Sequence, residues 1–235
     1  MSARVEVVDP GVLRIVLPGR ASNAYLFLGT RIALVDSGSE ESQRDLLAAL
    51  RQLEIKRERI SLLVLTHEHA GHAGGAAALP EALLVSHPFA AAKLRHGEEP
   101  LTKLRAARAP DVELSDGGAI RIGGFSFDVL HMPGHTSGSI CLYERSRALI
   151  VTGDTVLARG TSPVATQNGS SGEHLESLER LASLRARLLL PGHGPLSDDP
   201  AADIGAAAAT VRSRLSGWVD DEQATPTARS RIAPL

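Results

Sequence analysis

Three histidines lie within six residues of one another in a chain that has only nine histidines among 235 residues. They are His67, His69 and His72, in the stretch LVLTHEHAGHAGG over residues 62–74, directly behind an apolar run. Imidazole is the commonest metal ligand among protein side chains. The stretch therefore predicts a metal site at the end of a buried strand.

Three other segments share this form: an apolar run, then a tight turn, then a side chain that can bind a metal. They are VLHMPGH, LIVTGD and LLLPGH, which end at His135, Asp154 and His193. Loops at the ends of buried strands meet the small tolerances of metal coordination, with Zn–N distances of about 2.0 Å. We therefore expect all six side chains to belong to one metal centre.

The spacing within the cluster favours two adjacent metal sites. His67 and His69 are two residues apart in an extended turn, so both can face one point. His72 lies three positions further on, where the chain should enter a helix, and it can face a neighbouring point from another direction.

Other chemistries fit the residues less well. A helical H-E-x-x-H zinc site needs a histidine at position 71, which is Gly71 in this chain. Ser137 and Ser139 lie outside any G-x-S-x-G turn, so neither is a good candidate nucleophile. The remaining histidines are expected to be hydrogen-bonded structural residues: His87, His96, His131 and His174.

The hydrophobic pattern predicts the elements that position these residues. Alternating apolar and polar runs over 5–9, 12–17, 24–29 and 31–36, separated by turn residues, indicate a meander of strands. A helix capped by Ser39 is expected over about 40–54. Strands at 60–66 and 82–86 and short helices at 71–79 and 88–96 follow it.

A second set of strands is expected over 119–124, 125–132, 139–144, 148–154 and 187–192. Ser170 and Glu173 form a capping-box pattern before a helix with an apolar leucine face. Ile204, Val211, Leu215 and Trp218 mark a final helix. Residues 97–118 are charged and broken by Pro and Gly, and are predicted to be a mobile surface segment.

The composition is that of an ordinary globular protein, with 43% hydrophobic and 22% charged residues and a formal net charge of −2. We expect a single domain over 1–222 and a flexible tail over 223–235. No apolar stretch approaches the roughly 20 residues that span a bilayer, and no signal-like segment is present, so a cytoplasmic location without a membrane partner is expected. Cys141 is the only cysteine, which excludes an internal disulfide and a thiolate-rich zinc site.

The motifs THEHAGH, PGHTSGS, TGDT and PGHG together resemble those of the metallo-β-lactamase superfamily. The resemblance runs from NAYLFLGTRIALVDSG to LLLPGHGP, most of the chain, and is greatest with the group of β-lactamase-like endoribonucleases and uncharacterised hydrolases. It implies an α/β fold, an αββα sandwich of two mixed sheets flanked by helices, with the site along one edge of the sheets.

The resemblance also implies roles for the candidate residues. His67, His69 and His135 would bind one metal, His72 and His193 the second, and Asp154 would bridge them. Asp154 and His72 are the candidate catalytic residues.

The family's motif has an aspartate where this chain has Gly71. Its absence predicts one strong site and a second that is weak or partly occupied. Asp36, in the VDSG turn, is a candidate to fill the gap or else a structural turn residue, and Glu68 is expected to point away from the metals. Zinc is the expected metal, with iron or manganese as alternatives, since histidine and carboxylate ligands do not choose among them.

The leading functional hypothesis is a metal-dependent hydrolase that uses a metal-bound hydroxide on a small-molecule ester, thioester or lactone. One alternative is a relative that binds metal or a ligand but is catalytically impaired. Another is an iron-dependent persulfide dioxygenase or a single-strand RNA nuclease. Aromatic residues make up only 3%, so nucleic acid is a poor partner, and a basic run is more typical of a solvated face: Lys93, Arg95, Lys103, Arg105 and Arg108. No pattern specifies the oligomeric state.

Overall fold

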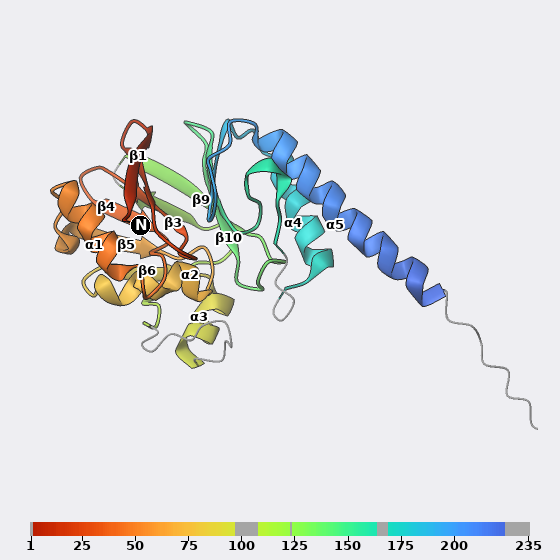
Figure 1. The fold of residues 1–235 in the computed structure, drawn as a ribbon, viewed down its shortest axis with the longest axis horizontal. Helices are drawn as coiled ribbons and strands as arrows, with labels where there is room; N and C mark the ends of the chain where they lie inside the picture. The colour runs from red at the N-terminus through yellow and green to blue at the C-terminus, as the bar shows by residue number, and fades with distance from the viewer. Residues whose placement is uncertain (1, 97–107, 123, 164–168, 224–235) are drawn as a thin grey trace, which may run out of the picture.

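The strands form two sheets that pack face to face, with helices on the outer side of each sheet (Figure 1). The computed structural model describes residues 2–96, 108–122, 124–163 and 169–223. Both sheets contain parallel and antiparallel pairs. The αββα sandwich predicted from the sequence is confirmed.

The first sheet has seven strands in chain order, antiparallel from β1 to β4 and parallel from β4 to β7. They are β1 (Arg4–Asp9), β2 (Val12–Val16), β3 (Asn23–Phe27), β4 (Ile32–Val35), β5 (Ile60–Val64), β6 (Leu83–Ser86) and β7 (Val112–Glu113). The change to parallel pairing begins where the first helix connects β4 to β5, because a parallel pair needs a crossover.

The second sheet has five strands in the order β12-β11-β10-β9-β8, and only its β11–β12 pair is parallel. They are β8 (Ala119–Ile122), β9 (Phe125–His131), β10 (Ile140–Glu144), β11 (Leu149–Gly153) and β12 (Leu188–Pro191). The crossover from β11 to β12 contains a helix that lies on the outer face.

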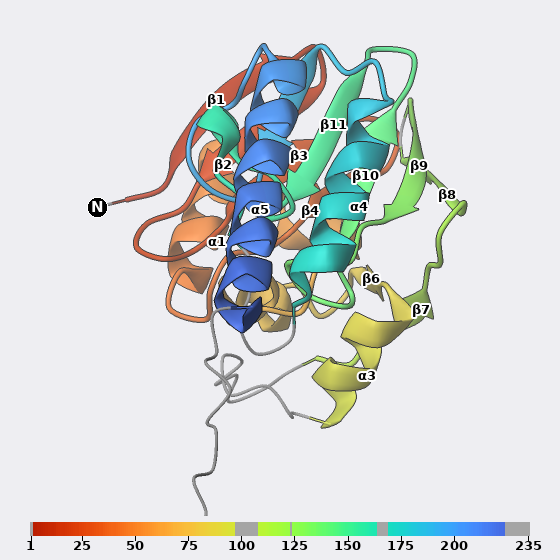
Figure 2. The ribbon, with the colours of Figure 1, turned by 90° about the vertical axis from the view of Figure 1, so that its right-hand side faces the viewer.

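The helices divide between the two outer faces, and the last two lie side by side over the second sheet (Figure 2). They are α1 (Gln43–Gln52), α2 (Ala70–Ala73), α3 (Pro88–His96), α4 (Ser171–Ala182) and α5 (Pro200–Gln223), with short 3₁₀ turns at Arg57–Arg59, Gly74–Ala78 and Ala158–Gly160. Ser170 caps α4 as predicted, since its hydroxyl accepts a hydrogen bond from the Glu173 N–H.

The alternation of side chains along the central strands produces the layered core. On β3, Tyr25 and Phe27 face the second sheet, whereas Ala24 and Leu26 pack in the layer beneath α1. Phe27 makes edge-to-face contacts with Phe125 and Phe127 across the sandwich, at ring-centroid distances of 5.3 and 4.8 Å. These rings fix the distance between the two sheets.

Two local predictions are corrected. The segment predicted to be mobile, 97–118, contains β7, which pairs with β6 through such bonds as Leu114 N–H to the Ser86 carbonyl, while its part 97–107 lies outside the described residues. Helix α1 begins after Ser42 and not after Ser39, and the Ser42 hydroxyl donates to the Ser39 carbonyl instead of capping the helix. The last helix extends to Gln223, and the rest of the predicted tail, 224–235, lies outside the described residues, so the flexible tail stays a prediction.

None of the described helices is both long and apolar enough to cross a bilayer.

We predict that Phe27→Ala lowers the free energy of unfolding by about 3–5 kcal/mol, because it removes a fully buried ring between the sheets. Phe89→Ala is the matched control: Phe89 is 54% exposed, so its loss should cost no more than about 0.5 kcal/mol. Urea unfolding followed by circular dichroism measures both. Equal losses for the two variants would contradict this account of the core.

Candidate metal centre

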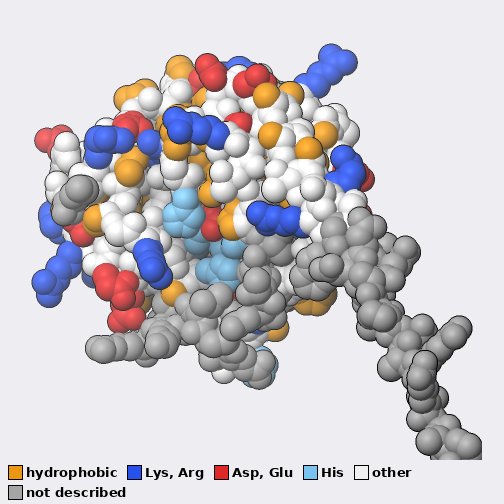
Figure 3. Space-filling view, turned by 45° about the vertical axis from the view of Figure 1, so that its right-hand side comes forward, with side chains coloured by type: hydrophobic (Ala, Val, Ile, Leu, Met, Phe, Trp, Pro, Cys, Tyr) orange, Lys and Arg blue, Asp and Glu red, His pale blue; other side chains and the backbone are white. Residues whose placement is uncertain are grey.

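The six residues predicted from the sequence lie at one edge of the sandwich, after the carboxyl ends of strands in both sheets. His67 and His69 follow β5 and His72 lies in α2, so these three come from the first sheet. His135, Asp154 and His193 follow β9, β11 and β12 of the second sheet. Histidine side chains reach the surface near the middle of the face shown in Figure 3, with Lys and Arg side chains around them.

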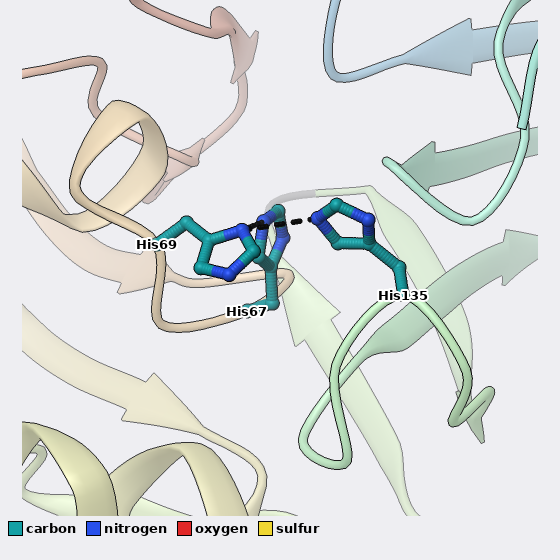
Figure 4. Close-up of side chains that lie close together, drawn as sticks. All are labelled: His67, His69 and His135. Carbon is teal, nitrogen blue, oxygen red and sulfur yellow. Dashed lines mark hydrogen bonds between the residues drawn. The ribbon is translucent and has the colours of Figure 1, made fainter. Parts of the chain in front are cut away.

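His67, His69 and His135 form the first group (Figure 4). His69 Nδ1 lies 3.1 Å from His67 Nε2 and 3.0 Å from His135 Nε2. Two nitrogens that each lie about 2.1 Å from a tetrahedral zinc ion are roughly 3.4 Å apart. The three nitrogens are therefore spaced as ligands of one ion are.

His67, His72 and Asp154 form a second group, and their ligand atoms lie within 4.8 Å of one another. His72 Nε2 is 3.4 Å from Asp154 Oδ1 and 3.3 Å from His193 Nε2. Asp154 Oδ2 lies 3.6 Å from His135 Nε2 and 3.5 Å from His193 Nε2. The Asp154 carboxylate thus lies between the two groups of histidines.

The donor set fits a metal ion. Asp154 Oδ1 is buried and has no hydrogen-bond partner among the described residues. A buried carboxylate oxygen without a partner is costly, and a bound cation would satisfy it. The nitrogens around it belong to imidazoles, which together with carboxylates are usual zinc ligands.

Hydrogen bonds behind the ligands fix which imidazole nitrogen faces the centre. His72 Nδ1 donates to Asp36 Oδ2 at 2.8 Å, and His135 Nδ1 donates to the Pro163 carbonyl at 2.6 Å. Because Nδ1 is the donor in each ring, Nε2 is the nitrogen that faces the centre and would bind the metal.

Asp36 does not fill the place of the missing carboxylate. It adopts a left-handed backbone with φ of 58°, and its two oxygens accept hydrogen bonds from the Thr66 N–H, the Thr66 hydroxyl and His72. The carboxylate is therefore engaged by Thr66 and His72 and not directed at the centre. The alternative interpretation from sequence, that Asp36 is a structural turn residue, describes it better.

Gly71 contributes no side chain to the centre, and a neighbouring loop lies against it. The Gly71 carbonyl accepts a hydrogen bond from Ser22 N–H at 2.8 Å. A Cβ atom at position 71 would lie 3.0 Å from the Arg20 carbonyl oxygen. A small residue is therefore favoured here by the close approach of the 18–22 loop.

Glu68 points away from the histidines, as predicted, and is fully buried. Its Oε1 forms an ion pair with Lys93 of α3, and its Oε2 accepts a hydrogen bond from the Thr136 hydroxyl at 3.0 Å. Because Glu68 lies between His67 and His69 and Thr136 follows His135, this buried acid links the two loops that carry the first group.

The charge state of the centre suits a cation. Burial lowers the pKa of His67 well below its usual value and that of His69 to about 4, and it also lowers the pKa values of His135 and His193. Burial lowers the pKa of His72 too, but the carboxylates of Asp36 and Asp154 outweigh it and raise that pKa to about 10. Burial raises the pKa of Asp154, but neighbouring histidines, His72 first, hold it well below its usual range. Metal binding at His72 must therefore displace a proton.

The other predicted residues lie away from the centre. His87 stacks on His131 at 3.9 Å, and His174 Nε2 donates to the Thr155 carbonyl at 2.9 Å, in keeping with structural roles. His96 is an exposed residue at the end of α3. In the basic run, Arg95 pairs with Glu113 and Arg108 with Asp111, while Lys103 and Arg105 lie outside the described residues.

Sequence comparisons agree with this geometry. The profile of the metallo-beta-lactamase superfamily matches residues 17–193. An atrochrysone carboxyl ACP thioesterase of Aspergillus fumigatus is 30% identical over 83% of this chain and 59% of its own length. A beta-lactamase-like protein 2 homolog of Caenorhabditis elegans is 26% identical over 83% of this chain and 65% of its own. The chain thus spans less than two thirds of these relatives.

Solved structures share the fold. A metallo-beta-lactamase family protein from Thermus thermophilus superposes with a TM-score of 0.81 at 24% identity, over 91% of this chain and 83% of that one. A metallo-beta-lactamase from Cronobacter sakazakii with a HARLDQ motif gives a TM-score of 0.77 at 17% identity, over 95% of this chain and 97% of its own. The subgroup predicted from the sequence stays a prediction, but the match over residues 17–193 shows that the chain belongs to the metallo-beta-lactamase superfamily.

Proposed function

We propose that this protein is a metal-dependent hydrolase of small-molecule thioesters. The observation that carries the proposal is the convergence of five imidazoles and one carboxylate at the edge of the sandwich. The sequence left esters, thioesters and lactones open. The relative named as a thioesterase favours the thioester among them.

His67, His69 and His135 would hold the first metal, and His72 and His193 the second, with Asp154 between them. A metal held there would lower the pKa of a bound water toward about 7 and polarise the thioester carbonyl. Asp154, whose Oδ1 has no hydrogen-bond partner among the described residues, would act as a metal ligand and help to orient the metal-bound water. His72 is kept in place by Asp36.

The leaving group favours thioesters over nucleic acid. A two-metal centre clamps the attacking and leaving oxygens of a phosphodiester, which requires a well-held second metal. Gly71 removes a carboxylate from that second site. A thiol has a pKa near about 8.5, so it leaves as a thiolate with much less help from a metal. One strong site is therefore better matched to a thioester than to RNA.

Gly71 also favours a second candidate, a relative that binds metal but is catalytically impaired. The two candidates differ in turnover, not in metal content, so they are separated by the activity of the metal-loaded protein.

We predict one tightly held metal per chain and a second that is lost on dialysis against a mild chelator. Elemental analysis of protein loaded with zinc, then separately with manganese or iron, measures both. His135→Ala should lose the tight metal, whereas His193→Ala should lose only the weak one. Two metals retained per chain after dialysis would contradict the weakened second site.

We predict that the metal-loaded protein hydrolyses generic thioesters, with esters and lactones tested beside them. His67→Ala should lower kcat/KM at least about 100-fold, because His67 lies in both groups of ligands. Release of thiol followed with a chromogenic reagent measures the rate. If turnover does not exceed that of His67→Ala under any of the three metals, the impaired relative is the better description.

We predict that Gly71→Asp increases retention of the second metal relative to Gly71→Ala. Both variants place a Cβ atom 3.0 Å from the Arg20 carbonyl, so their difference isolates the carboxylate. A gain of about 10-fold or more in activity over Gly71→Ala indicates a wild-type centre limited by its missing ligand. Lower activity than Gly71→Ala indicates that the glycine belongs to a working, altered site.

A further inference from the structure

A pocket of about 540 Å³ adjoins the metal centre. It is formed by residues of β1, β2 and the start of β3, by the loop between β2 and β3, and by the turn after β12 that carries His193. None of its residues other than His193 belongs to the candidate metal ligands.

His193 forms the wall that the pocket and the centre share. Its side chain is 35% exposed, whereas those of His72 and Asp154 are 1% and 9% exposed. Its Nε2 lies 3.5 Å from Asp154 Oδ2, so one edge of the ring faces the centre. A substrate with its reacting carbonyl at the metals can therefore extend over His193 into the pocket.

The pocket has a net positive charge. Arg4 and Arg14 line it, and Glu6 pairs with both, through Oε1 to Arg4 at 2.6 Å and Oε2 to Arg14 at 2.7 Å. Two guanidinium charges and one carboxylate leave a net charge of +1.

The two arginines differ in exposure. The Arg14 side chain is 6% exposed and donates to the Gly194 carbonyl at 3.1 Å, while its Nε has no hydrogen-bond partner among the described residues. The Arg4 side chain is 69% exposed. Arg14 thus supplies a fixed buried charge whose donors are not all used, and Arg4 supplies a charge at the rim that can turn to a ligand.

Apolar residues complete the lining. Val16, Leu17 and Pro195 also line the pocket. A short aliphatic stem that ends in an acidic group matches a pocket lined by both apolar side chains and arginines.

We propose that this pocket binds an anionic end of the substrate, a carboxylate or phosphate, while the thioester lies at the metals. The inference rests on the proposed function. It identifies the substrate class as an acidic thioester, and the acidic group belongs either to the acyl part or to the thiol part.

Three substrates and three variants test the pocket. S-Butanoyl-N-acetylcysteamine is neutral, S-succinyl-N-acetylcysteamine is acidic in its acyl part, and S-butanoyl-phosphopantetheine is acidic in its thiol part. Arg4→Ala removes a charge at the rim, and Glu6→Gln raises the net charge of the pocket to +2. Arg212→Ala is the matched control, since Arg212 is 57% exposed and pairs with Glu179 on a distant helix surface.

With the acidic substrate that fits, Arg4→Ala should lower kcat/KM about 5- to 10-fold, mainly through KM, and Glu6→Gln should raise it. Neither variant should change kcat/KM for the neutral substrate more than about twofold. Arg212→Ala should leave kcat/KM for all three substrates unchanged. The acidic substrate whose kcat/KM responds to these variants shows whether the acidic group belongs to the acyl part or to the thiol part of the substrate. Equal effects on neutral and acidic substrates, or no effect on either acidic one, would overturn the proposal.

Binding measurements separate this proposal from the proposed function. Thioether analogues of the three compounds cannot be hydrolysed, and calorimetry gives their dissociation constants for the metal-loaded protein. If wild type hydrolyses nothing but binds an acidic analogue about 5- to 10-fold more tightly than Arg4→Ala does, the pocket stands and the hydrolase proposal fails. If thioesters are hydrolysed but wild type and Arg4→Ala bind every analogue equally, the pocket proposal fails and the hydrolase proposal stands.

Discussion

Hydrogen bonds between the two sheets hold the halves of the metal centre together. The Asn23 side chain of β3 donates to the carbonyls of Pro191 and Gly194, at 3.0 and 3.1 Å, and the Tyr25 hydroxyl donates to the Pro191 carbonyl at 2.7 Å. On the other side of the centre, Ile140 N–H donates to the Thr66 carbonyl at 2.8 Å. Because three candidate ligands come from each sheet, their nitrogens and oxygens stay within coordination distance only while the sheets keep this alignment. The aromatic core between the sheets fixes their separation, and these bonds fix their lateral position.

The electrostatics of the centre follow from its single inward carboxylate. Asp36 is turned to His72 and Glu68 to Lys93, so Asp154 is the acid that lies among the histidines. Two divalent cations bound to five neutral imidazoles and one carboxylate would leave a net charge of about +3 in a partly buried site. A centre without a carboxylate at position 71 would therefore hold a second metal less tightly and would at the same time favour an anionic ligand. The positive pocket beside His193 adds to the same preference.

The sequence predicted what depends on local pattern. Each candidate ligand follows an apolar run and a tight turn, so both the strands and the residues after them were recognisable. Features that depend on residues distant in the sequence could not be predicted in this way. β7 is only two residues long and exists because it pairs with β6. Asp36 was recognised as a residue near the centre, but its role depends on a hydrogen bond to His72, which is 36 positions away in the chain.

The pocket had no signal in the sequence for the same reason. Arg4 and Arg14 are ordinary polar positions in two alternating strands, and only the antiparallel register, which pairs Arg14 with Glu6, brings their charges together.

The 18–22 loop connects the altered ligand set to the pocket. Its Arg20 carbonyl approaches Gly71 so closely that even a Cβ atom there is tight, and its Ser22 N–H bonds to the Gly71 carbonyl. The same loop contributes Gly19 and Ala21 to the pocket wall beside His193. A larger residue at position 71 would push this loop outward and change the shape of the pocket. The same loop thus contacts position 71 and lines the pocket, so we expect a change at position 71 to alter both metal binding and the shape available to the substrate.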